Sequence, residues 1–172
     1  MKFFAPAALA IAPVLALAIP QTAAVQGYMP NRIVTSFDEQ TLVQAAGELN
    51  ATVQKVRQGE VEAYAITFQG NVKALAYLYA CENGTACSGL RMVALMERPD
   101  GMDDAAFVSA LEDRNRQQRL AKFYRTPAGK AVAERYLVAD GGIAMANVRT
   151  EMALFRNQIL QFARALYPAA AE

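Results

Sequence analysis

The chain has 172 residues, which corresponds to one domain of ordinary size. It contains no histidine, the commonest metal ligand and the usual acid–base group near neutral pH, so serine-type triads, histidine-based zinc sites and cysteine–histidine nucleophiles are excluded. With 17 basic and 16 acidic residues, the net charge is +1. This balance argues against nucleic acid as a partner, because domains that bind nucleic acid are normally basic.

Residues 1–24 have the pattern of a secretory signal peptide. Lys2 precedes an apolar run from Phe3 to Ile19, and small residues stand one and three positions before a cut after Ala24. An uncleaved membrane anchor is the alternative, but the run of 17 residues is short for a span and prolines interrupt it. We expect an exported protein, periplasmic or secreted, with no transmembrane segment after cleavage.

A flexible lead-in is predicted over residues 25–37, followed by a first helix from about Asp38 to Asn50. Ser36 and Glu39 have the spacing of a capping box, and apolar residues follow at helical spacing.

Four strands joined by short turns are predicted after this helix. Residues 61–69 alternate clearly, with Tyr64, Ile66 and Phe68 on one side of the strand. The expected strands are 52–57, 61–69, 73–80 and 89–97. Short strands with short connections form an antiparallel meander.

A second helix is expected to begin at Asp103 or Asp104 and to fade near residues 115–118, before two strands at 119–125 and 130–139. A long final helix, with Asn147 as its cap, has apolar residues spaced 4-3-4-3-4. They are Val148, Met152, Phe155, Ile159, Phe162 and Leu166. The same spacing fits a coiled coil, but a half-covered sheet is available to receive this stripe.

The predicted element order is α-β-β-β-β-α-β-β-α. Runs of strands interrupted by single helices indicate an α+β domain, with helices packed on one face of an antiparallel sheet. We therefore predict a single domain over residues 38–168.

Cys81 and Cys87 are the only cysteines. A connection of five residues between two antiparallel strands brings them opposite each other, within reach of a disulfide. An exported protein meets an oxidising compartment, which favours this structural disulfide. Free thiols, a redox pair and a metal site are the alternatives, although metal sites need about four ligands and redox pairs are usually Cys-x-x-Cys.

A family resemblance rests on an aromatic-rich strand running into Cys81-x-x-Gly84-x-x-Cys87, and on a helix ending in Asp113-Arg114-Asn115-Arg116-x-x-Arg119. An apolar strand ending near Pro99, a hairpin and a long last helix complete the pattern. Over about residues 38–167 the chain resembles the YbjN-domain family, often described as bacterial sensory transduction regulators. The resemblance implies a fold similar to that of type III secretion chaperones and no established enzymatic activity.

A basic region, an alanine-rich sheet face and a pocket are candidates for binding, and the basic region comes first. Arg114, Asn115, Arg116 and Arg119 form a basic region that either is simply solvated or contacts an acidic partner. In the resemblance, Asn115 and Arg119 correspond to an Asn-x-x-x-Arg pattern, whose first expected role is to satisfy backbone groups at a helix end.

Alanines are frequent on the predicted strands, although alanine is a poor strand former. They allow either close helix packing on the sheet or a homodimer through the sheet face that no helix covers. The alanines are Ala63, Ala65, Ala74, Ala76, Ala94, Ala131 and Ala133.

The sequence favours an exported, non-enzymatic module that binds another protein and has a chaperone-like or regulatory role in the bacterial envelope. No cofactor and no metal are expected. The alternative is a periplasmic protein that binds a small molecule or lipid between the last helix and the sheet, in a pocket lined by Tyr64, Tyr77 and Phe155.

Overall fold

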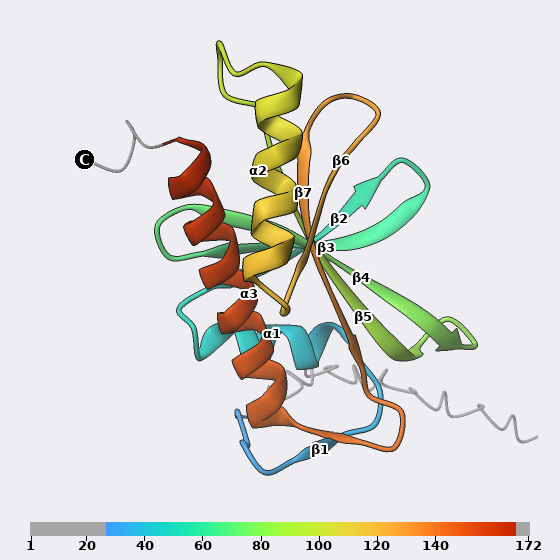
Figure 1. Ribbon diagram of the computed structural model, residues 1–172. Coiled ribbons are helices and arrows are strands. Elements are labelled where there is room, and N and C mark those ends of the chain that lie inside the picture. Colours follow the sequence, from blue (N-terminus) through green and yellow to red (C-terminus); the bar gives the residue numbers. More distant parts are fainter. Residues whose placement is uncertain (1–26, 168–172) are drawn as a thin grey trace, which may run out of the picture.

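A computed structural model describes residues 27–167, so the expected signal peptide lies outside the described residues. Three helices accompany a six-stranded antiparallel sheet of order β2-β3-β4-β5-β7-β6 and a two-stranded sheet of β1 and β8 (Figure 1). The helices are α1 (Glu39–Gly47), α2 (Asp104–Gln117) and α3 (Met145–Leu166). The strands are β1 (Ile33–Val34), β2 (Thr52–Gln58), β3 (Val61–Phe68), β4 (Val72–Glu82), β5 (Ala86–Met96), β6 (Lys122–Arg125), β7 (Ala131–Val138) and β8 (Ile143–Ala144). The predicted α+β class is confirmed.

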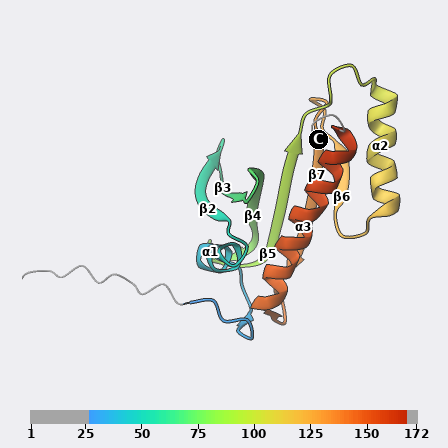
Figure 2. The ribbon, with the colours of Figure 1, turned by 90° about the vertical axis from the view of Figure 1, so that its left-hand side faces the viewer.

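The core lies between the sheet and the helices. Buried side chains of all three helices belong to one apolar cluster with alternate residues of the strands, so the helices cover the same face of the sheet (Figure 2). The predicted stripe of α3 is fully used, since its six members from Val148 to Leu166 are all buried. Phe162 packs against Phe123 of β6, with ring centroids 4.8 Å apart.

Aspartates cap the first two helices. The Asp38 carboxylate accepts a hydrogen bond from the Thr41 amide, and the Asp103 carboxylate accepts one from the Ala106 amide, both at 2.7 Å. The capping box predicted at Ser36 is therefore wrong, because the helix begins two residues later than that motif requires.

Helix α3 is capped by backbone from the lead-in. The helix starts at Met145 and has no side-chain cap, so Asn147 lies inside its first turn, contrary to prediction. The amides of Met145 and Ala146 donate instead to the carbonyls of Arg32 and Pro30, at 2.8 and 2.9 Å. The segment before α1 thus satisfies donors that a helix start leaves unpaired.

The segment 27–37 is part of the fold, and the prediction that residues 25–37 are a loose lead-in is wrong for these described residues. β1 pairs with β8, and Val34 and Phe37 are buried in the core. The Phe37 amide also donates to the Cys87 carbonyl at 2.6 Å. The short strand was missed because two residues carry no detectable period.

The hairpin of β4 and β5 is tighter than predicted. Both strands continue past the cysteines, so the turn is only 83–85. Ala80 has a φ of 51°, a left-handed conformation that bends β4 just before Cys81. In contrast, the predicted strand at 119–125 is shorter, because β6 begins only at Lys122.

Most strand alanines face the helices. Ala74, Ala76, Ala94, Ala131 and Ala133 are buried in the core cluster, where their small side chains let α3 approach the sheet. Ala63 and Ala65 alternate along β3 with Tyr64 and Ile66, so these two alanines lie on the face that the helices do not cover. Close helix packing therefore accounts for the larger group.

Candidate interaction surface

The cysteine pair forms a disulfide. Cys81 and Cys87 are cross-strand partners, and their Cα atoms lie 3.8 Å apart. The bond closes the end of the hairpin beside the first residues of α1.

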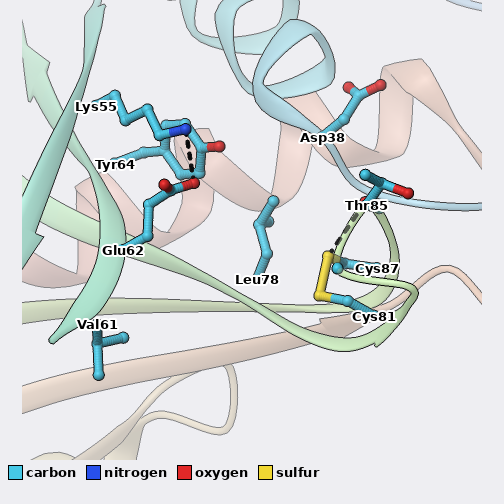
Figure 3. A pocket seen from close by; sticks show the side chains of 10 residues that line it. Asp38, Lys55, Val61, Glu62, Tyr64, Leu78, Cys81, Thr85 and Cys87 are labelled. Carbon is cyan, nitrogen blue, oxygen red and sulfur yellow. Dashed lines mark hydrogen bonds and ion pairs between the residues drawn. A yellow bond between two sulfur atoms is a disulfide. The ribbon is translucent and has the colours of Figure 1, made fainter.

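A hollow of about 450 Å³ lies next to this disulfide (Figure 3). One wall holds the Lys55–Glu62 ion pair, 2.8 Å between nitrogen and oxygen, with the Tyr64 ring beside it. Leu78 lies between this wall and the disulfide. The hollow is open; Lys55 and Glu62 pair with each other, and the Asp38 carboxylate at its rim caps α1.

The predicted basic region does not act as one patch. Arg114 is buried: it donates to the side-chain oxygens of Gln158 and Gln161 of α3, at 3.1 and 2.8 Å, and its guanidinium lies over the Phe123 ring. Burial lowers the pKa of Arg114. The proposed role of Arg114 as a contact for a partner is therefore wrong, since its side chain fastens α2 to α3.

Asn115 also has an internal role. Its amide nitrogen donates to the Phe123 carbonyl at 2.7 Å, and its oxygen accepts from the Phe123 amide at 2.8 Å. β6 is an edge strand, and this side chain occupies its outward-facing groups as a neighbouring strand would. Arg116 is exposed and pairs with Asp113 and Glu112 of its own helix. Arg119 is also exposed.

The predicted ligand pocket is not formed by its three residues. Tyr64 is cross-strand partner to Ala76 and lies on the helix-covered face, while Tyr77 lies on the opposite face. Phe155 is 1% exposed within the core. The sheet separates Tyr77 from the other two side chains, so they cannot line one pocket.

The opposite face of the sheet has no helix over it in the described chain, and four tyrosines gather on it. We call this surface the tyrosine face; it comprises the outward residues of β4, β5, β7 and β6. In register, Tyr77 is opposite Arg91, which is opposite Tyr136. Tyr79 and Tyr124 stand on either side of this row.

Arg91 is the centre of the tyrosine face. Its guanidinium donates to the Glu134 carboxylate at 2.7 and 2.9 Å and to the hydroxyls of Tyr79 and Tyr124 at 3.2 and 3.3 Å. It also lies 5.8 Å from the centroid of the Tyr77 ring. The arrangement fixes a cation among aromatic rings that remain partly accessible to solvent.

The electrostatics of this cluster favour the ion pair. Burial disfavours the charged form of Arg91, but its hydrogen bonds outweigh burial and raise its pKa. Burial likewise opposes the charged form of Glu134, yet the bonds from Tyr124 and Arg91 lower its pKa below the ordinary value. Tyr124, which is partly buried and donates to Glu134 at 2.8 Å, has a raised pKa.

Apolar side chains extend the tyrosine face. Leu95, Tyr136 and Val138 are each about half exposed, at 52%, 49% and 55%. A shallow hollow of about 250 Å³ lies beside Leu95, and apolar atoms form most of its lining. It is lined by Ala65, Ile66, Thr67, Lys73, Ala74, Leu75, Val93 and Leu95. Leu95 and Val138 lie on opposite sides of the Arg91–Glu134 pair, and exposed apolar side chains around such a centre are typical of an interaction site.

Gly89 makes room for the aromatic cluster. A Cβ atom at this position would collide with the hydroxyl end of Tyr136 and approach Tyr79 to 3.4 Å. The missing side chain therefore lets the Tyr136 ring lie across β5.

Alternation along the predicted strand 73–80 puts Tyr77 and Tyr79 on one side of it, but the sequence analysis did not single out Arg91, Glu134 and Tyr124. No local pattern marks these residues: β5 has a single charged residue, Arg91, and the two charged residues of β7, Glu134 and Arg135, are adjacent. Which strands are neighbours decides that these residues meet, and the β5–β7 pairing crosses α2 and β6 in the sequence.

Among residues 27–167, no group of three potential metal-ligating side chains occurs. No helix within the same residues is long and apolar enough to span a membrane.

Fold and surface together define an α+β domain with helices on one face of its sheet and an open aromatic face on the other. The chain belongs to the YbjN family: the family model, described as "Putative bacterial sensory transduction regulator", matches residues 40–168. A solved structure of YbjN from E. coli, titled "a putative transcription regulator", is similar in fold. It has a TM-score of 0.59 and 16% identity, and the match covers 81% of this chain and 95% of that chain. No curated protein matches.

Proposed function

We propose that this protein is an exported, non-enzymatic module that binds another protein and has a regulatory or chaperone-like role in the bacterial envelope. The observation that carries the binding role is the tyrosine face. Tyrosine and arginine are enriched in protein interfaces and among the residues that contribute most to binding. Here they occupy the centre of an apolar surface that no described helix covers.

The tyrosine face suits binding better than catalysis. Glu134, Arg91 and Tyr124 satisfy one another, so no titratable group of this cluster is left poised to exchange a proton with a substrate. The family description as a regulator agrees with a binding role.

Export is supported by the disulfide and by the signal-like pattern of residues 1–24. Disulfides persist in oxidising compartments and are rare in the cytosol. A protein with a structural disulfide is suited to the periplasm or the exterior.

The small-molecule alternative receives less support. Its three lining residues do not meet, and the hollow of about 450 Å³ lies between two hairpins and the start of α1. A lipid would need a larger enclosed apolar volume.

Two measurements test the proposal. Osmotic-shock fractionation should release the protein, with Cys81 and Cys87 resistant to alkylation until a reductant is added; a cytoplasmic, fully alkylated protein would contradict export.

Chemical crosslinking in cells should yield a protein adduct with the tagged wild type. A variant with Tyr79→Ser and Tyr136→Ser should lose that adduct, and an unchanged adduct would contradict binding through the tyrosine face.

A further inference from the structure

The charges of the tyrosine face are unbalanced. Arg91 is paired with Glu134, and Lys122, the cross-strand partner of Glu134, adds a second positive charge near that carboxylate. Lys73 and Lys122 form no ion pair of their own in the described part of the chain. The Lys122 ammonium lies 5.3 Å from the centroid of the Tyr124 ring, where it remains exposed. The face therefore has more positive than negative charge.

The two lysines lie at opposite margins of the apolar surface. Lys73, on β4, flanks the shallow hollow beside Leu95. Lys122, on β6, flanks a second hollow of about 330 Å³ that also includes Arg119 and Tyr136. In the register, Leu75, Val93 and Leu95 lie between the two lysines, whereas Tyr77, Tyr79 and Tyr136 lie to one side of the line that joins them.

The sheet register sets the spacing between these margins. β4 and β6 are separated by three strand spacings, and Lys73 is offset from Lys122 by two residues along the strands. With about 4.8 Å between strands and about 3.4 Å per residue, the two positions are about 16 Å apart. An extended segment of about five residues spans this distance.

A second copy of this chain does not complement the surface. Two tyrosine faces packed together would each contribute an excess of positive charge, and like charges in an interface weaken association. Nucleic acid is not favoured either, because a backbone track requires more than two or three free cations.

We propose that the partner is a protein whose binding segment is extended, with acidic residues about five positions apart and apolar or aromatic residues between them. The acidic residues contact Lys73 at one margin and Lys122 with Arg119 at the other. The apolar residues cover Leu75 and Leu95, next to the tyrosines. This inference rests on the proposed binding role of the tyrosine face.

The test places a photoreactive phenylalanine analogue at Leu95, which is half exposed beside Lys73, and maps the adduct by mass spectrometry. We expect the crosslinked partner segment to carry acidic residues on both sides of apolar ones. Lys73→Glu with Lys122→Glu should lower the adduct yield about tenfold, since attraction becomes repulsion. The matched control is Arg149→Glu with Arg164→Glu, which reverses two exposed cations of α3 and should leave the yield unchanged.

The outcomes separate this inference from the proposed function. A protein adduct whose yield is unchanged or increased by the lysine reversal, or whose segment is not acidic, overturns the inference but supports the tyrosine face as a binding site. An adduct to a second copy of this chain, to lipid or to nucleic acid also overturns the inference. No adduct from Leu95 overturns both. Circular dichroism of each variant shows whether it remains folded.

Discussion

Removal of the disulfide gives a prediction whose size follows from the structure. Cys81 and Cys87 close a loop of about seven residues, for which the chain-entropy relation gives about 2.4 kcal/mol at 25 °C. Unfolding entropies of about 2.1 cal/mol/K per residue, over about 140 residues, convert this to a fall in Tm of about 8 °C.

Two preparations separate the cross-link from the substituted atoms. The variant with Cys81→Ser and Cys87→Ser removes the bond, but it also places a hydroxyl at Cys87, which is 2% exposed. Wild type unfolded with and without reductant changes the bond alone. Thermal unfolding followed by circular dichroism should show the fall of about 8 °C in reduced wild type. Reductant should not affect the variant.

The reasoning would be refuted if reduced wild type, with both thiols shown to be alkylated, unfolded within about 2 °C of the oxidised protein. That result would mean that neighbouring contacts, such as the bridge between Phe37 and Cys87, already restrain the hairpin without the cross-link.

Three further predictions concern individual side chains. Asn115→Ala leaves the amide and carbonyl of Phe123 without their partner and should lower the free energy of unfolding by about 1–3 kcal/mol in urea; a smaller loss would mean that water replaces the asparagine. Gly89→Ala should displace the Tyr136 ring and abolish the adduct from Leu95 while changing Tm by only a few degrees; an unchanged adduct would show that the ring position is irrelevant. Because the pKa of Glu134 is lower in the fold, its contribution to stability is present above about pH 4.5 and is lost as the pH falls through the folded-state value; in urea unfolding between pH 3 and 6, Glu134→Gln should flatten this dependence, and identical profiles for both proteins would contradict it.

The predicted fold agrees with the structure because its signals are periodic. The stripe of α3 and the alternation in β3 each repeat over several turns or residue pairs, and the apolar side of each element is buried as predicted. The signals that failed are local: Ser36 and Asn147 are good capping residues, but Asp38 caps α1, and α3 begins where carbonyls of the lead-in accept its first amides.

The candidate site was less accessible to sequence reasoning. Arg114 and Asn115 stand in a run of charged and polar residues, which suggested an exposed patch, yet their partners on α3 and β6 come from elsewhere in the chain. Tyr77 was predicted to line a pocket with Phe155, on the α3 side of the sheet, but it lies on the opposite face, and alternation alone does not show which face α3 covers. The tyrosine face depends on the pairing of β5 with β7, which no local pattern specifies.

The central claim, that the tyrosine face binds a protein, is tested most directly by comparing photocrosslinking from two positions in cells. One photoreactive residue replaces Tyr136 on that face, and the other replaces Asn157, which is exposed on α3 on the opposite side of the molecule. We predict a discrete protein adduct from position 136 and none from position 157. An adduct from position 157 alone, or equal adducts from both, would contradict the claim.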